Sequence, residues 1–342
     1  MVRFKPALYA LLLLSACGGS PWAEEPTDPD PDTGGIDSEG ALPPGTTSPS
    51  PNRKIVRYEA KDAETGSGYV TNVAYDVDTD TFTVDGLAFD GDNAYVRGTK
   101  VGSLGAVAVY EGKPTEPDDY TGTEVSQLQH RALYGVSKNG QVEFAIVRTG
   151  GYIDYGFGGF IYQRNGGVTL PAEGEGADLT RGQAHYKGEM TSLRDFDGRA
   201  GLEYGRADMT MDIDFDDFND GNAVKGRIYN RTVYDINGND ITADIVAALE
   251  EDADATQDGL PVIVLDIGEN VMNDNGEIAG TVQSNYYTGT GAVEGFEAGN
   301  YYAIVSGDKA QTVVGMIVVE SDDPRWDGVT TRETGGFILS RK

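Results

Sequence analysis

The sequence predicts an all-β fold, in which a strand-rich domain over residues 53–175 precedes a small eight-stranded antiparallel β-barrel over residues 176–342. Two observations favour this class. The chain is rich in glycine, with 47 residues, and short runs of β-branched and aromatic residues alternate with turn-forming clusters along its length. One segment alone has a convincing helical pattern, so the helix is expected to be a connection between strands.

The N-terminus, residues 1–16, has the pattern of a bacterial lipoprotein signal peptide. Two basic residues precede an apolar run at positions 7–14, which is too short to cross a bilayer as a helix, since that needs about 20 residues. The sequence Leu14-Ser15-Ala16-Cys17 follows and resembles the bacterial lipobox. We therefore expect cleavage before Cys17 and lipidation of its thiol, so that the lipid attaches the chain to the membrane.

The residue after Cys17 is Gly18 rather than Asp, which by resemblance to proteobacterial sorting rules favours the outer membrane. The alternative is an ordinary secretory peptide with an incidental cysteine. Cys17 is the one cysteine of the chain, so an internal disulfide, a cysteine nucleophile and a cysteine metal ligand are excluded from the folded region.

Residues 17–52 read as an acidic, proline-rich tether. Positions 18–52 hold eight of the fourteen prolines and seven acidic residues, with no basic residue before Arg53. A segment of this composition cannot form a core and is expected to be disordered and extended. It serves either as a spacer that holds a domain away from the membrane or as a passive linker.

The net charge of −30, from 56 acidic and 26 basic residues, argues against nucleic acid as a partner. An acidic surface repels phosphate groups and anionic lipid headgroups, and it suits a soluble face or a partner with a basic patch.

The first folded region contains seven predicted strands separated by turn signals. Asn139-Gly140 lies between two apolar runs and predicts a hairpin. The run Asp76–Asp80 resembles part of a calcium loop, but Thr81 and Leu87 stand where glycine and glutamate would be needed, so a solvated turn is the better interpretation. The predicted strands are 69–75, 81–89, 94–97, 105–110, 131–136, 142–149 and 157–162.

The second folded region begins after a boundary within residues 170–177. Its clearest strand is 206–215, in which apolar residues at odd positions from Ala207 to Phe215 alternate with Asp or Thr, as in a half-buried antiparallel strand. The predicted helix is 241–251, with Thr242 as a possible cap. The other predicted strands are 182–188, 223–230, 262–267, 277–283, 300–305, 312–319 and 335–340.

These glycine and apolar positions resemble the β-barrel domain of transferrin-binding protein B. The similarity rests on Gly182-x-Ala184-x-Tyr186-x-Gly188, Asp214-Phe215, Val224-x-Gly226-x-Ile228-x-Asn230, residues 302–307, Val314-Gly315 and Gly335-Gly336-Phe337, and it covers roughly residues 176–342. The family also carries a strand-rich handle before its barrel, so residues 53–175 are expected to form a handle-like domain.

The resemblance implies a surface lipoprotein that binds a ligand or a protein, such as a secreted or host protein, often together with a TonB-dependent outer-membrane channel. Two departures exclude transferrin itself from this expectation. The transferrin receptors have two handle–barrel pairs and the chain has room for one, and their iron-protein-binding loops have no counterpart in the sequence.

The residues that could carry catalysis or bind a metal are few and poorly spaced in the sequence. This favours a protein that is not an enzyme, with no metal and no cofactor. His130 and His185 are the only histidines, and no further ligands are spaced around them. A Gly-x-Ser-x-Gly elbow is absent, residues 307–310 lack the glycine spacing of a phosphate loop, and the acid clusters at 212–217 and 250–254 read as solvated faces.

Glycines inside predicted barrel strands are interpreted as structural, because strand glycine usually marks a bend or a close approach. These are Gly188, Gly226, Gly280 and Gly315. The tyrosine-rich stretches 152–160 and 285–287 are either exposed binding loops or, as we favour, packing residues. No ligand-binding residue can be assigned.

The favoured function is that of an outer-membrane lipoprotein, exposed on the cell surface, that binds a ligand or protein. The alternatives are a structural or interaction lipoprotein of the envelope without a small ligand and, third, a hydrolase on a β scaffold. A soluble barrel with its apolar face inward is favoured over a membrane-spanning barrel, because paired aromatic girdles are missing and an acyl anchor would be redundant. The sequence leaves open the ligand, the side of the membrane that the barrel faces and the oligomeric state.

Overall fold

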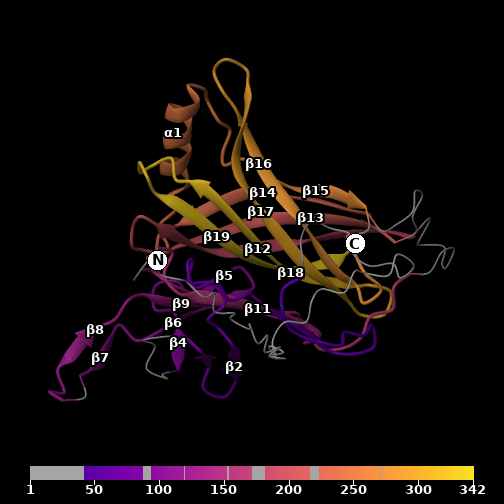
Figure 1. Ribbon diagram of the computed structural model, residues 1–342, viewed down its shortest axis with the longest axis horizontal. Coiled ribbons are helices and arrows are strands. Elements are labelled where there is room, and N and C mark those ends of the chain that lie inside the picture. The colour runs from indigo at the N-terminus through magenta and orange to yellow at the C-terminus, as the bar shows by residue number, and fades with distance from the viewer. Residues whose placement is uncertain are drawn as a thin grey trace, which may run out of the picture. The chain divides into compact units, whose positions relative to one another are not determined.

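The strands form a curled nine-stranded sheet and a closed eight-stranded barrel (Figure 1), so the predicted all-β class is confirmed. The computed structural model describes residues 42–87, 94–118, 120–151, 154–171, 182–215, 223–269 and 271–342. Cys17 and the predicted signal peptide lie outside these residues, as does most of the predicted boundary at 170–177. In the part of the chain that is described, no helix is both long and apolar enough to cross a membrane.

The curled sheet, which we call the half-barrel, has the strand order β1-β11-β10-β9-β6-β4-β3-β2, with β5 paired to β6. The rings of Tyr75 on β2 and Tyr134 on β9 contact each other with centroids 5.2 Å apart, although three strands separate them in the sheet, because the sheet curls. Its strands are β1 (Ile55–Tyr58), β2 (Asn72–Asp76), β3 (Thr81–Asp85), β4 (Tyr95–Arg97), β5 (Ser103–Leu104), β6 (Val107–Glu111), β9 (His130–Val136), β10 (Val142–Thr149) and β11 (Gly158–Arg164).

The barrel consists of β12 to β19, each antiparallel to its neighbours. Its first and last strands pair over twelve positions, from Tyr186↔Arg341 to Asp197↔Thr330, and this pairing closes the barrel. The strands are β12 (Gln183–Asp197), β13 (Glu203–Asp214), β14 (Ala223–Tyr234), β15 (Ile263–Glu269), β16 (Glu277–Tyr287), β17 (Val293–Ser306), β18 (Thr312–Asp322) and β19 (Thr330–Arg341).

The alternation predicted for residues 207–213 is confirmed on β13. Ala207, Met209, Met211 and Ile213 are buried, and the residues between them are partly exposed. The buried set packs with residues from the other barrel strands in a single hydrophobic cluster, so it faces inward. Because side chains alternate between the two faces of a strand, the apolar pattern alone places these residues inside.

Each of the eight predicted barrel strands corresponds to an observed strand. The other half-barrel strands agree with the prediction in order, but β1 and β5 were not predicted because both are short. The predicted strand 69–75 begins only at Asn72, and residues 88–89 of the strand predicted at 81–89 are not described.

The helix prediction is confirmed with a correction to its cap. α1 (Thr242–Ala253) connects β14 to β15 and buries Ile245 and Leu249. Thr242 does not cap the helix, because its hydroxyl accepts a hydrogen bond from the backbone N–H of Val233 at 2.9 Å. The side chain of Asp240 instead accepts the backbone N–H of Thr242 at 2.9 Å.

The structure also differs from the predicted tether at its C-terminal end. Residues 42–52 were expected to be disordered, yet Thr46 and Tyr58 donate backbone hydrogen bonds to Val56 and Pro44, which join residues 44–46 to β1. The guanidinium of Arg57 further bonds the carbonyl of Pro43. Residues 42–52 therefore lie against the half-barrel, because they form hydrogen bonds with the otherwise unpaired backbone groups of its edge strand β1.

Candidate functional site

A buried arginine joins the half-barrel to the barrel. Arg148 on β10 is fully buried; it donates to both carboxylate oxygens of Glu59, at 2.9 and 2.7 Å, and to the hydroxyl of Thr334 on β19 at 2.7 Å. Arg332 on the barrel strand β19 also joins the two parts. It binds Asp195 on the neighbouring barrel strand β12, and it donates to the hydroxyl of Ser67, between β1 and β2, at 2.7 Å. Charged groups this deeply buried are stable only when they are paired.

Two more arginines connect the same two parts. The Nε of Arg57 on β1 donates to Glu277 on β16 at 2.7 Å, and Arg164 on β11 donates to the carbonyl oxygen of Val305 on β17 at 2.8 Å. Phe144 of β10 packs against β19, where a Cβ added to Gly336 would lie 2.2 Å from its ring. The contact therefore needs glycine at position 336.

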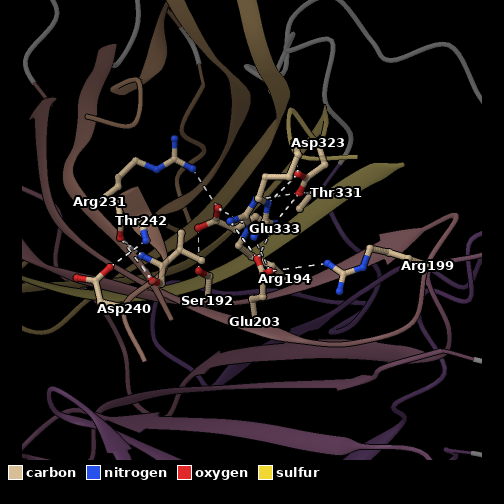
Figure 2. Close-up of polar contacts among 12 residues, drawn as sticks. Ser192, Arg194, Arg199, Glu203, Arg231, Asp240, Thr242, Asp323, Thr331 and Glu333 are labelled. Atoms are coloured by element: carbon tan, nitrogen blue, oxygen red, sulfur yellow. Dashed lines mark hydrogen bonds and ion pairs between the residues drawn. The ribbon is translucent and has the colours of Figure 1, made fainter. Parts of the chain in front are cut away.

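A second cluster of charges lies inside the barrel (Figure 2). Arg231 on β14 makes two bonds of 2.6 Å to Glu297 on β17 and one of 3.0 Å to Glu333 on β19. Ser192 on β12 donates to the other oxygen of Glu333 at 2.7 Å. Arg325 extends the network to Glu203, at 2.8 Å, and to Asp323.

A β-bulge turns Arg231 into the barrel. On the alternation of β14, Ile228 faces inward and position 230 should do the same. Asn230 instead adopts a left-handed conformation with φ 54° at the register shift opposite Ala207. The bulge adds one residue, so Arg231 faces inward and the amide of Asn230 binds Asp208 on the outside at 2.7 Å.

This inner cluster is suited to holding the barrel together rather than to proton transfer. Burial alone would raise the pKa of Glu333, but the charges of Arg231 and Arg194 overcome it and hold that pKa below its usual range. Burial would lower the pKa of Arg231, and its carboxylate partners Glu297 and Glu333 raise it instead. Glu333 and Arg231 therefore remain ionised at neutral pH, whereas a general acid or base needs a pKa near the working pH.

The two histidines are not brought together. His130 is buried at the start of β9, with Nδ1 2.9 Å from the carbonyl oxygen of Leu128. His185 lies on the outer face of β12, where Nδ1 is 2.7 Å from Asp212. The described residues contain no group of three or more histidines, cysteines or acids that could hold a metal ion.

The Asp76–Asp80 run is a turn between β2 and β3. The carboxylate of Asp76 accepts the backbone N–H groups of Asp78, at 2.9 Å, and Thr79. These bonds lower the pKa of Asp76. Asp80 is used within the half-barrel, where it binds the guanidinium of Arg97 at 2.7 Å.

The barrel glycines that the sequence marked are structural, as predicted. A Cβ at Gly188 would lie 2.4 Å from a backbone oxygen of β19, and one at Gly226 would lie 2.6 Å from a backbone oxygen of β13. A Cβ at Gly280 would lie 2.5 Å from the ring of Tyr301, and one at Gly315 would lie 2.4 Å from the ring of Phe337. Neighbouring strands and rings occupy the space that a side chain would need.

The packing interpretation holds for the first tyrosine-rich stretch and not for the second, in which Asn285 and Tyr287 are exposed. Tyr155 and Phe160 are buried, while Tyr152 lies outside the described residues. In the second stretch Tyr287 is exposed at the end of β16. Of the acid clusters, residues 250–254 fall at the end of α1, and residues 216–217 are outside the described part.

The feature that the sequence did not reveal is a separate hairpin between β6 and β9, formed by β7 (Thr115–Pro117) and β8 (Glu124–Ser126). We call residues 115–126 the projecting hairpin, since Figure 1 shows it extending away from the other strands of the half-barrel. Its strands pair with each other and with no other sheet. It was missed because its residues are polar and one is proline, a composition that reads as a loop.

Asp118 organises the tip of this hairpin. Its carboxylate accepts the backbone N–H groups of Tyr120, at 3.1 Å, and Thr121, at 2.8 Å, together with the hydroxyl of Thr121. Gly122 completes the turn with φ 67° and donates to the carbonyl of Asp118. The backbone N–H groups of Tyr120, Thr121 and Gly122 are thus all bonded to Asp118, while the side chain of Tyr120 is 98% exposed.

The projecting hairpin is acidic around this aromatic side chain. Glu116, Asp118 and Glu124 are its described carboxylates, and Lys113 lies at its base, 3.5 Å from Glu116. Val125 is also exposed on β8. An ordered turn that exposes a tyrosine and a valine among acids has the chemistry of a protein-binding surface, because aromatic residues supply most contact energy and charge selects the partner.

Comparison with known proteins gives structural similarities of low identity. No family model matches the chain, and no curated protein matches it either. A mutant of the vaccine antigen Transferrin Binding Protein B from Haemophilus parasuis Hp5 matches 84% of this chain and 46% of its own, at 12% identity and a TM-score of 0.38. Intact Ap-TbpB, with N and C lobes, matches 77% of this chain and 52% of its own, at 11% identity and a TM-score of 0.31.

A DUF3598 family protein of unknown function from Nostoc punctiforme matches at 9% identity and a TM-score of 0.22, over 84% of this chain and 88% of its own. The chain spans about half the length of the transferrin-binding proteins it matches. At this level of similarity neither membership of a family nor a function follows.

Proposed function

We propose that this chain is an outer-membrane lipoprotein, anchored through Cys17 and displayed on the cell surface, that binds a protein partner with the tip of the projecting hairpin. The observation that carries the proposal is the nearly complete exposure of Tyr120 on a tip whose backbone is fixed by Asp118. A fixed loop loses little conformational entropy on binding, so more of the contact energy appears as affinity.

The partner is a secreted or host protein with a basic rim around an apolar slot, and a TonB-dependent channel takes up what is captured. The acidic hairpin and the net charge of −30 both favour a basic surface.

The binding proposal is tested by site-specific photocrosslinking on intact cells. A photoreactive phenylalanine at position 120 should give one protein adduct that saturates with partner concentration, and the same group at the exposed position Val77 should give none. Native chain added in solution should compete for the adduct, and the Tyr120→Ser chain should not. Equal labelling from both positions, or competition by Tyr120→Ser, would rule out the hairpin as the binding element.

Anchoring and display are tested separately. In Cys17→Ser the chain should no longer fractionate with membranes, because a hydroxyl cannot form the thioether. Protease added to intact cells should digest residues 53–342 of the native chain. Membrane association that persists in Cys17→Ser would refute the lipid anchor, and full protection from protease would refute surface display.

A further inference from the structure

The apolar layer between the half-barrel and the barrel is open to solvent at one edge. A cleft of about 720 Å³ lies there, and we call it the junction cleft. Its wall includes Phe144 of β10, Val107 of β6 and Ile338 of β19, which all belong to or pack against the hydrophobic cluster between the two parts. Val136 at the end of β9 also lines it and is 47% exposed. Phe144 is only 2% exposed, so the apolar surface open in the cleft comes from Val107, Val136 and Ile338.

Two charged groups of residues line the junction cleft. Gly105 lies beside an ion pair between Arg206 and Glu189, whose atoms are 2.6 Å apart, and a Cβ on Gly105 would lie 2.5 Å from the carboxylate. The β9–β10 turn contributes Lys138. Arg206 is neutralised by Glu189, whereas Lys138 forms an ion pair with none of the carboxylates that the structure describes. Of the charged groups lining the cleft, the ammonium group of Lys138 is thus the one available to a ligand.

We propose that the junction cleft binds a linear acyl chain with an anionic head group, as in a fatty acid. The chain would lie on Val107, Val136 and Ile338, and the carboxylate would lie at Lys138. The volume falls within the range of roughly 300–1,000 Å³ that is usual for small-molecule sites, and such sites combine an apolar wall with few polar groups. This ligand is independent of the protein partner proposed for the projecting hairpin.

Calorimetric titration of the full chain carrying Cys17→Ser, which lacks the predicted lipid, tests the proposal with octanoate, decanoate and dodecanoate below their micelle concentrations. Binding should saturate at one molecule per chain, and the Kd should fall up to about fifteenfold for every two carbons, because each buried methylene contributes about 0.8 kcal/mol. No saturable binding, or a Kd that does not change with chain length, would overturn the proposal.

The polar end is tested with dodecanol as the neutral probe of equal length. Lys138→Met should weaken dodecanoate binding about threefold to fivefold and leave dodecanol unchanged, as expected for a charge contact near the surface. The control Lys100→Met, at an exposed lysine outside the cleft, should alter neither. An equal effect of Lys138→Met and Lys100→Met on dodecanoate would remove Lys138 from the site.

The apolar wall is tested with Val136→Asp, which should weaken both probes at least tenfold, against Val77→Asp at an exposed valine elsewhere. Val136 lies directly opposite Glu143 in the sheet, so an aspartate at position 136 also destabilises the fold through repulsion between the two carboxylates. Photolabelling of the chain with native Val136 by a diazirine fatty acid avoids this problem. Adducts should map to the peptides around Val107, Val136 and Ile338, and adducts confined to other peptides would refute the proposal.

Discussion

Arg57 and Glu277 lie 220 positions apart in the sequence and form a buried salt bridge of 2.7 Å between β1 and β16. Glu277→Ala should lower the free energy of unfolding by about 3–5 kcal/mol, because it leaves the guanidinium of Arg57 buried without its counter-charge. Urea unfolding at neutral pH measures this change.

The double variant Arg57→Met with Glu277→Leu is the control. Replacing both members of a buried pair with apolar residues is often close to neutral, so most of the lost stability should return. A double variant as unstable as Glu277→Ala alone would mean that the salt bridge is not the cause.

A methyl group at position 336 should push the half-barrel from the barrel. In Gly336→Ala the new Cβ would lie 2.2 Å from the ring of Phe144, so the variant should lose about 1–3 kcal/mol of stability through overpacking. Adding Phe144→Leu to Gly336→Ala should recover part of that loss. Thermal unfolding of the single and double variants measures both effects, and additive losses would contradict the steric explanation.

Acid should destabilise the fold through Glu59 and Glu333. Burial would raise the pKa of Glu59, but the charge of Arg148 and the bonds it donates hold that pKa below its ordinary value, and Glu333 behaves likewise with Arg231 and Arg194. A lowered folded-state pKa means that the unfolded chain binds more protons in acid. The stabilisation is therefore complete above about pH 5 and is lost as the pH falls through the folded-state pKa.

The variant Glu59→Gln separates this effect from general acid unfolding. It should be less stable than the native chain at pH 7, and its urea midpoint should fall less between about pH 5 and pH 3, since one titrating group is gone. A variant with the same pH slope as the native chain would show that Glu59 does not contribute.

Tyr120→Ser should separate binding from stability. The side chain is 98% exposed, so its removal should change the free energy of unfolding by less than about 0.5 kcal/mol. Loss of an aromatic anchor at an interface should weaken partner binding by about thirtyfold, or 2 kcal/mol. Isothermal titration against the captured partner and urea unfolding measure the two quantities, and an unchanged affinity would contradict the role of the tip.

The barrel could be predicted because its chemistry is periodic. In residues 207–213 every second side chain is apolar, and the burial of β13 follows that period. Strands such as β7 and β8 could not be predicted in this way, since they bury little and carry Glu, Thr and Pro. The exposure of Tyr120 is a property of the folded hairpin and leaves no periodic signal in the sequence.

The buried charges could not be predicted either. Arg332 and Glu333 are adjacent and face opposite sides of β19, yet both are buried, because one contacts the half-barrel and the other the barrel interior. A charged pair in a strand normally indicates a solvent-facing position. The bulge at Asn230 adds a second obstacle, since it reverses the faces of the residues that follow it.

The pairing of β12 with β19 has a consequence for biogenesis. No barrel can exist until residues 330–341 have left the ribosome, because they supply the partner for β12. Until then β12 and β18 each keep one edge open, and open edges pair readily with other chains. A cell that exports this protein would therefore need a chaperone to hold the chain unfolded until residues 330–341 have been made, and nonsense mutations before residue 330 should yield aggregates or degraded chains rather than a smaller working protein.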